Sequence, residues 1–226
     1  MVTRIIIARH GNTFTKDQTP LRVGAETDLP LVETERGTNV GKYLKMRTLI
    51  PVAVFAAPLK RTTETARLAI AALDKDIPLI ADNRFTEIDY GPDEAKTEEE
   101  VVARIGQDAL DAWNANAVVP QGWNVSVDGI IQTWKDFARE VEQNYAHKTV
   151  LVVSSNGIIR FAPYLTGDFE TFCQNFNIKV GTGSVCILEK DDGDDFWTVK
   201  EWGTKPKDKL SDKSAPLSAT ASVAHH

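Results

Sequence analysis

Several features that would assign a protein to a particular class are missing or scarce in this sequence. No apolar run among its 226 residues approaches the roughly 20 that a membrane-spanning helix needs. The N-terminal residues do not show the pattern of a signal peptide. Basic residues do not predominate, because 26 Lys and Arg face 32 Asp and Glu and give a net charge of -6. We therefore expect neither nucleic acid nor an anionic membrane as the main partner.

Cysteine is also scarce. The two cysteines, Cys173 and Cys186, lie in apolar surroundings. A disulfide between them is compatible with the sequence but not indicated by it, so we expect reduced core residues of a cytoplasmic protein. The sequence shows no internal repeat. With 42% hydrophobic residues, the chain is long enough for one large domain or two small ones with a sizeable core.

The first informative segment is a run of β-branched residues that ends in Arg-His-Gly. Ile5 to Ala8 predict a strand that is buried on both faces, as in a parallel sheet covered by helices. Ligand sites in such sheets lie beyond the carboxyl ends of the strands, where Arg9 and His10 follow. A guanidinium beside an imidazole favours an anion site with a nucleophile or proton carrier. Alternatively, the strand simply ends there with an incidental His.

Two further buried strands carry polar residues to their carboxyl ends. Residues 52–56 precede a charged turn and a helix that contains Arg61. Residues 149–153 precede Ser155 and Asn156. Because the carboxyl ends of parallel strands share one edge of a sheet, we expect Arg61, Ser155 and Asn156 to lie near Arg9 and His10.

The other segments predict an alternation of strands and helices. Residues 14–30 form a long polar loop, and loops of this length in a compact domain are usually functional. A capping box, Thr97 with Glu100, predicts the start of a helix that carries Val101, Ile105 and Ala109. Further helices are expected over residues 35–47, 62–73, 130–145, 158–165 and 169–176, a short strand over 79–81, and a closing hairpin over 184–190 and 196–202. Residues 204–226 have almost no large apolar side chain and predict a disordered tail.

Four motifs occur in a fixed order and together resemble one family. They are Arg9-His10-Gly11-x-Thr13, Ala57-Pro58-Leu59-Lys60-Arg61-Thr62, Glu87-x-x-x-Gly91 and Val153-Ser154-Ser155-Asn156-Gly157-Ile158-Ile159-Arg160. Each motif alone is weak, but in this order they resemble the histidine phosphatase superfamily, in its phosphoglycerate mutase-like branch. The resemblance implies a three-layer α/β/α sandwich with a mostly parallel central sheet, in one domain over residues 1–203.

The resemblance also implies a catalytic mechanism. His10 would attack phosphorus and carry a phosphohistidine intermediate, while Arg9 and Arg61 would bind the phosphoryl oxygens through bidentate hydrogen bonds. Glu87 would protonate the departing oxygen and then activate water. Two guanidiniums can stabilise the transferred group without a metal, so neither a metal nor another cofactor is expected.

By similarity to the mutases, Asn12, Gly24 and Tyr90 would face the substrate. The fourth motif departs from the family pattern, because Ser155 stands where a second His is usual and Asn156 where Gly is usual. The Ser155 hydroxyl and the Asn156 amide would still bind a phosphoryl group, but more weakly than a charged donor.

No other histidine is expected to replace the missing one. His147 precedes the strand and would lie about 25 Å from position 155, if each extended residue spans about 3.3 Å. Losing one transition-state donor typically costs about 10²–10³ in rate, which leaves room for a slower phosphatase.

Three functions remain open. The first is a metal-independent phosphomonoesterase that acts on a small phosphorylated metabolite. The second is a weak or inactive relative that binds a phosphorylated ligand or a protein partner. The third is a phosphoglycerate-type mutase, which is disfavoured because between Glu87 and the strand at 149–153 no adjacent Arg pair is present to hold a second phosphate. The sequence determines neither the substrate nor the oligomeric state.

Overall fold

A computed structural model describes residues 1–211 and contains a six-stranded sheet with the order β3-β2-β4-β1-β5-β6. The strands are β1 (Val2–Arg9), β2 (Ala53–Ala56), β3 (Leu79–Ala81), β4 (Thr149–Ser154), β5 (Val185–Asp191) and β6 (Thr198–Thr204). β1, β2, β3 and β4 are parallel, whereas β5 and β6 form the closing antiparallel hairpin. The expected mostly parallel sheet is thus confirmed.

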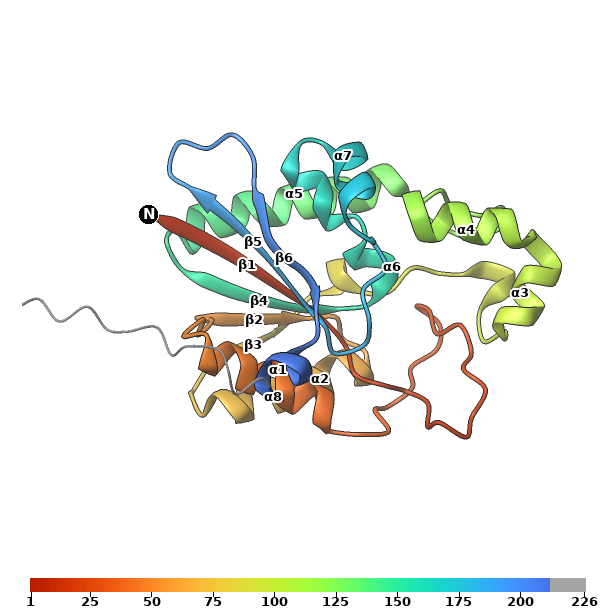
Figure 1. Cartoon of the computed structure of the whole chain (residues 1–226), viewed down its shortest axis with the longest axis horizontal. Coiled ribbons are helices and arrows are strands. Elements are labelled where there is room, and N and C mark those ends of the chain that lie inside the picture. The colour runs from red at the N-terminus through yellow and green to blue at the C-terminus, as the bar shows by residue number, and fades with distance from the viewer. Residues whose placement is uncertain (212–226) are drawn as a thin grey trace, which may run out of the picture.

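Helices cover both faces of the sheet (Figure 1). They are α1 (Glu35–Met46), α2 (Lys60–Leu73), α3 (Glu98–Ile105), α4 (Gln107–Asn116), α5 (Val127–Asn144), α6 (Asn156–Ile159), α7 (Phe169–Asn175) and α8 (Pro206–Ser211), with 3₁₀ helices η1 (Asn83–Phe85), η2 (Gly91–Asp93) and η3 (Ala162–Thr166). Alternate residues of β1 enter two separate cores: Ile5 and Ile7 pack with α5, and Ile6 and Ala8 pack with α1 and α2. This two-sided burial explains the continuous apolar run in β1 and confirms the three-layer α/β/α architecture.

Two of the expected helices are interrupted. The helix that begins at the Thr97–Glu100 capping box stops at Gly106, whose φ of +83° is a left-handed conformation, and α4 follows. The helix expected over residues 158–165 divides into α6 and η3. Pro163 lies at the start of η3 and lacks the N–H that would continue the helical hydrogen bonds.

The folded chain extends beyond the boundary expected at residue 203. Thr204 is the last residue of β6, and residues 206–211 form α8 instead of a disordered tail. α8 lies beside α1 (Figure 1), and Lys207 pairs with Glu35 at 3.1 Å. In this short, largely polar segment Leu210 is the one large apolar side chain, and the contact with α1 accompanies its helical order. The rest of the expected tail, residues 212–226, lies outside the described residues.

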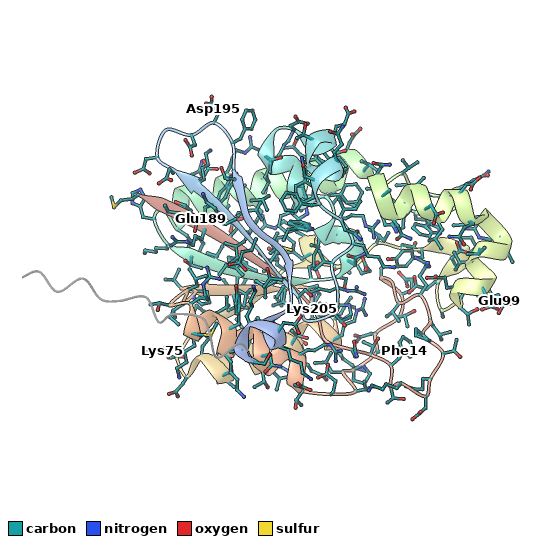
Figure 2. The ribbon with its side chains drawn as sticks, viewed as in Figure 1. Phe14, Lys75, Glu99, Glu189, Asp195 and Lys205 are labelled. Atoms are coloured by element: carbon teal, nitrogen blue, oxygen red, sulfur yellow. The ribbon has the colours of Figure 1, made fainter. Side chains whose placement is uncertain are left out.

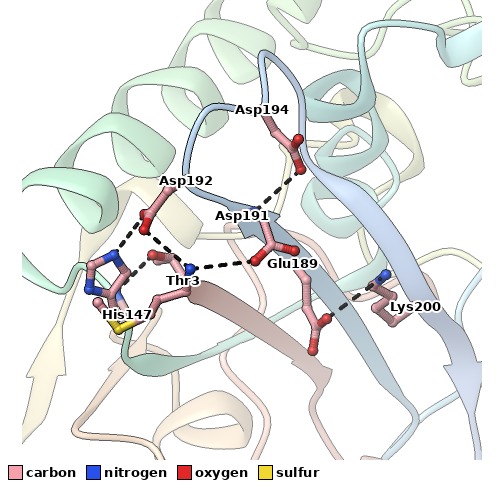
Figure 3. A network of polar contacts seen from close by, with 8 residues as sticks. Thr3, His147, Glu189, Asp191, Asp192, Asp194 and Lys200 are labelled. Carbon is pink, nitrogen blue, oxygen red and sulfur yellow. Dashed lines mark hydrogen bonds and ion pairs between the residues drawn. The ribbon is translucent and has the colours of Figure 1, made fainter.

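The amino end of the sheet carries a polar network of its own (Figure 3). His147, just before β4, contacts Asp192 of the β5–β6 turn through Nε2 at 2.7 Å, and its backbone N–H donates to Thr3 Oγ1. Asp192 also pairs with the N-terminal ammonium group at 3.2 Å. His147 is thus held at the amino end of the sheet, whereas His10 follows the carboxyl end of β1, so the separation expected between His147 and the strand ends is present. No helix among residues 1–211 is long and apolar enough to cross a membrane.

Candidate active site

The ends of three parallel strands bring the predicted residues together. β4 lies between β2 and β1 in the sheet, so the segments that follow these strands are neighbours. The backbone N–H of His10 donates to the Ser154 carbonyl at 3.1 Å, and that of Ala57 donates to the Val153 carbonyl at 3.3 Å. Arg61 follows in the first turn of α2. The segments that carry the predicted residues therefore come together at the carboxyl ends of the strands, as expected.

The imidazole of His10 is buried and held in one tautomer. Its Nδ1 lies 2.7 Å from the Gly11 carbonyl oxygen, and only 6% of the residue is exposed. Because a carbonyl oxygen can only accept, Nδ1 carries the proton and Nε2 keeps its lone pair. Burial, followed by the charges of Arg9 and Arg61, lowers the pKa of His10 well below its usual value. The ring is therefore neutral at physiological pH and offers Nε2 as a nucleophile.

Two guanidiniums lie close enough to this ring for their charges to lower its pKa, and each uses only part of its donors. Arg61 is fully buried and donates to the carbonyls of Thr27 at 2.7 Å and Gly24 at 3.0 Å. Arg9 donates to the Val180 carbonyl at 2.6 Å. The Nε of each is buried without a protein partner, and neither forms an ion pair with a carboxylate within residues 1–211. The site thus holds two positive charges that the described protein does not neutralise by contact.

Glu87 is a buried carboxyl group at the same carboxyl end of the sheet as His10. It accepts from the N–H groups of Ile88 at 2.9 Å and Gly157 at 3.2 Å, with the Tyr90 hydroxyl at 3.4 Å. Burial raises the pKa of Glu87, although these hydrogen bonds and the charges of Arg61 and Arg9 oppose the shift. A Cβ at position 157 would lie 2.3 Å from Glu87 Oε1, so glycine there makes room for the carboxyl group.

The two unusual positions of the fourth motif differ in their surroundings. Ser155 is fully buried, and its Oγ has no hydrogen-bond partner. Asn156 accepts the Val180 N–H through Oδ1 at 2.8 Å, which leaves its NH₂ group as a donor. Asn156 lines the pocket described below, whereas Ser155 does not. Direct contact between Ser155 and substrate therefore stays a prediction.

Asn12 is oriented by a residue that the sequence did not single out. Thr182 donates its hydroxyl to Asn12 Oδ1 at 2.6 Å, so the Asn12 NH₂ group remains free to donate. Gly24 has a structural part instead, because its N–H donates to Glu94 and its carbonyl accepts from Arg61. Thr182 lies just before β5, far from the first motif in sequence, and no spacing pattern connects the two.

A pocket of about 820 Å³ opens at this edge. Six predicted site residues line it: Arg9, His10, Asn12, Glu87, Tyr90 and Asn156. Arg61, Gly24 and Ser155 are not among its lining residues. Phe14, in the loop after β1, and Glu99, in α3, also line it, and both lie at the end of the molecule toward which β1 runs (Figure 2).

The sequence did not point to several residues that line this pocket. Arg22 comes from the long loop after β1, and Arg160 is the last residue of the fourth motif. Lys179 and Thr182 come from the segment before β5. Loop length pointed to the region of Arg22, but no pattern pointed to that residue.

Within residues 1–211, no group of three or more His, Cys, Asp or Glu residues could hold a metal ion.

Fold and site together define a class: an α/β protein with a neutral histidine near two arginines that form no ion pair within residues 1–211, at the carboxyl end of its sheet. Residues 5–205 match the model of the histidine phosphatase superfamily (branch 1), and the chain belongs to that family. It is 28% identical over 161 residues to 2,3-bisphosphoglycerate-dependent phosphoglycerate mutase 2 of Gloeobacter violaceus, covering 69% of this chain and 72% of the mutase. It spans about half the length of several other curated mutases that it matches.

Solved structures of both mutases and phosphatases share the fold. The phosphoglycerate mutase of Bacillus anthracis superposes with a TM-score of 0.74 at 20% identity, covering 91% of this chain and 97% of the mutase. The mycobacterial glucosyl-3-phosphoglycerate phosphatase gives a TM-score of 0.71 at 19% identity, covering 90% of this chain and all of the phosphatase. At this level of identity the likeness concerns the fold alone.

Proposed function

We propose that this protein is a metal-independent phosphomonoester hydrolase that acts on a small phosphorylated metabolite through a phosphohistidine on His10. One observation carries the proposal. The buried neutral imidazole has Nδ1 hydrogen-bonded to the Gly11 carbonyl and lies within reach of the positive charges of Arg9 and Arg61, which lower its pKa. Such charges stabilise the phosphoryl group as it transfers, and the free Nε2 is the atom that forms the new bond.

The proposed reaction has two steps. First, the Nε2 lone pair attacks phosphorus, the bond from phosphorus to the ester oxygen breaks, and Glu87 gives its proton to that oxygen. Then the Glu87 carboxylate takes a proton from water, the water oxygen attacks phosphorus, and the N–P bond breaks to release phosphate. The raised pKa of Glu87 favours the protonated form that the first step requires.

Active-site labelling tests this proposal. A brief reaction of the protein with a ³²P-labelled phosphomonoester, with EDTA present, should leave acid-labile, base-stable label on His10. The His10→Ala variant should take up no label and lose turnover. The matched control is His147→Ala, which removes an imidazole at the opposite edge of the sheet and should label normally. Label at another residue, or full activity in His10→Ala, would refute the assignment.

The main alternative is a phosphate-binding protein without turnover. Its test is a screen of phosphorylated metabolites for released phosphate, run beside binding measurements with vanadate. Tight vanadate binding with no hydrolysis of any ester would favour the binding protein over the hydrolase. Positional exchange of phosphate within one substrate, without net release, would instead indicate a mutase.

A further inference from the structure

The Glu33 carboxylate contacts the backbone of the first motif, although the proposed reaction gives it no part. Glu33 lies just before α1, and its Oε1 accepts the backbone N–H of Asn12 at 3.2 Å. Glycine at position 11 makes room for this contact, because a Cβ there would lie 3.2 Å from the same oxygen. A carboxylate therefore reaches the backbone beside the proposed nucleophile.

One peptide group connects Glu33 to the imidazole of His10. The N–H of Asn12 and the carbonyl of Gly11 belong to the same peptide group. That carbonyl accepts the Nδ1 proton of His10 at 2.7 Å. Because a peptide group is planar, the contact at its N–H also fixes the direction of its carbonyl. We call this series of the Glu33 carboxylate, the Gly11–Asn12 peptide and the His10 imidazole the Glu33 relay.

Further hydrogen bonds hold the same backbone segment. The hydroxyl of Thr65, in α2, accepts the Gly11 N–H at 3.0 Å. The Val32 N–H donates to the Asn12 carbonyl at 2.9 Å. These partners are neutral, so of these contacts only that of Glu33 brings a charge to the backbone.

Glu33 is ionised at neutral pH. Burial would raise its pKa, but the backbone N–H groups of Arg36 and Asn12 and the Arg36 guanidinium donate to the carboxylate, and the pKa is lowered. Arg36 Nη1 lies 3.2 Å from Glu33 Oε1 and partly offsets the charge, but the Arg36 side chain is 41% exposed and that of Glu33 only 24%. Glu64 and Arg67, both in α2, line the same hollow as Glu33. A negative charge is thus held against the Gly11–Asn12 peptide.

Such a charge is expected to act on the chemistry of His10. An anion that accepts the N–H of a peptide makes its carbonyl oxygen a stronger acceptor, because connected hydrogen bonds polarise one another. When Nε2 bonds to phosphorus, the ring becomes more positive and its Nδ1–H becomes a stronger donor. The hydrogen bond to Gly11 therefore strengthens during transfer, and the polarised carbonyl stabilises the transition state more than the free ring. The proton stays on Nδ1 throughout this step.

We propose that Glu33 is a positioning residue, which acts on His10 through the Gly11–Asn12 peptide and increases the rate at which the phosphohistidine forms. This inference rests on the proposed function for the role of His10 as nucleophile. Contact between Glu33 and the substrate is not required, and Glu33 is not among the residues that line the pocket of His10.

NMR of the protein labelled with ¹⁵N at histidine observes the relay without turnover. The chain has four histidines, and the Nδ1–H resonance of His10 is the one that His10→Ala removes. In Glu33→Gln, which keeps an oxygen acceptor but loses the charge, this proton should move upfield because its hydrogen bond weakens. The matched control is Glu64→Gln. The Glu64 carboxylate accepts the Leu31 N–H at 2.9 Å, in a different peptide group of the same segment, so the His10 proton should stay in place.

Single-turnover kinetics measure the effect on the reaction. Glu33→Gln should slow formation of the phosphohistidine from p-nitrophenyl phosphate about fivefold, the difference between a charged and a neutral acceptor, and Glu33→Leu about tenfold or more. Binding of inorganic phosphate should stay within about twofold in both variants, since an interaction that strengthens only during transfer does not affect ground-state binding. Glu64→Gln should keep both the rate and the affinity of the wild type.

The two measurements separate this inference from the proposed function. An unmoved His10 proton in folded Glu33→Gln, or an equal shift in Glu64→Gln, would overturn the relay. If both Glu33 variants form the phosphohistidine at the wild-type rate, the relay fails and the hydrolase stands. If the proton moves as expected but no phosphomonoester labels His10 in the wild type, the relay stands as a contact that tunes the imidazole and the hydrolase fails.

Discussion

At the residue scale, Ser155 and Asn156, the two neighbours at which the fourth motif is predicted to depart from the family pattern, have different surroundings. Ser155 stands where the motif resemblance predicts a second His, but its hydroxyl is buried without a partner and does not line the pocket. Asn156 lines the pocket with a free NH₂ group, because its oxygen is occupied by the Val180 N–H. The amide of Asn156 is therefore the better candidate for the donor that the imidazole would supply.

Paired alanine variants test this difference. Asn156→Ala should lower kcat by about 10²-fold, the typical cost of one lost transition-state donor. Ser155→Ala should leave kcat within about twofold and should not lower stability, since removing an unpaired buried hydroxyl is nearly neutral. Steady-state kinetics and thermal unfolding of both variants provide the comparison. A larger loss of kcat in Ser155→Ala would restore the hydroxyl as the phosphoryl ligand.

At the element scale, the start of α6 determines where Glu87 can lie. The N–H of Gly157 donates to Glu87, and the missing side chain leaves space for the carboxyl group. This contact joins the segment after β4 to a residue 70 positions earlier in the chain. The third and fourth motifs therefore depend on each other, although neither contains a signal of the other.

Gly157→Ala should displace the general acid. A Cβ there would lie 2.3 Å from Glu87 Oε1 and 2.8 Å from Ile88 Cγ1, so the carboxyl group must move. We expect kcat/KM for alkyl phosphates to fall about 10²-fold or more, with a much smaller loss for p-nitrophenyl phosphate, whose leaving group needs no proton. Gly181→Ala is the control, because its Cβ would meet only Ser184 Oγ, at 3.3 Å. Equal losses on both kinds of substrate would contradict the assignment of Glu87.

Strands were easier to predict than helix ends. The buried runs of β1, β2 and β4 follow from composition alone, since only two-sided burial favours continuous β-branched sequence. The break at Gly106 has no signal in the apolar spacing, which continues across it, whereas the break before η3 follows from Pro163, which lacks a backbone N–H. α8 was missed because its order comes from contact with α1 and not from its own composition.

At the scale of the whole molecule, burial of His10 lowers the free energy of unfolding in acid. The pKa of His10 lies well below its usual 6.5 in the folded protein. Between that usual value and the lowered one, the unfolded chain binds a proton that the folded protein does not. Stability must then decrease as the pH falls below about 6.5. Glu87 has the opposite sign, because its raised pKa makes the folded protein keep a proton that the unfolded chain releases.

Urea unfolding of the wild type and of His10→Gln between pH 7 and pH 5 isolates the contribution of His10. The wild type should lose more stability than the variant over this range, because only the wild type has the imidazole that the unfolded chain protonates. The Glu87 contribution is present in both proteins and cancels in the comparison. Parallel decreases would mean that His10 is not held neutral by the fold.

The sequence by itself determined the sheet, the family and the residues at the strand ends, because these depend on local patterns. Buried strands need continuous apolar runs, and the motif residues follow those strands directly. Only the tertiary structure decided how the pocket is completed: Thr182 donates to Asn12, and Gly157 lies beside Glu87. These pairs join segments far apart in the chain, and their contacts depend on packing, which no single segment encodes.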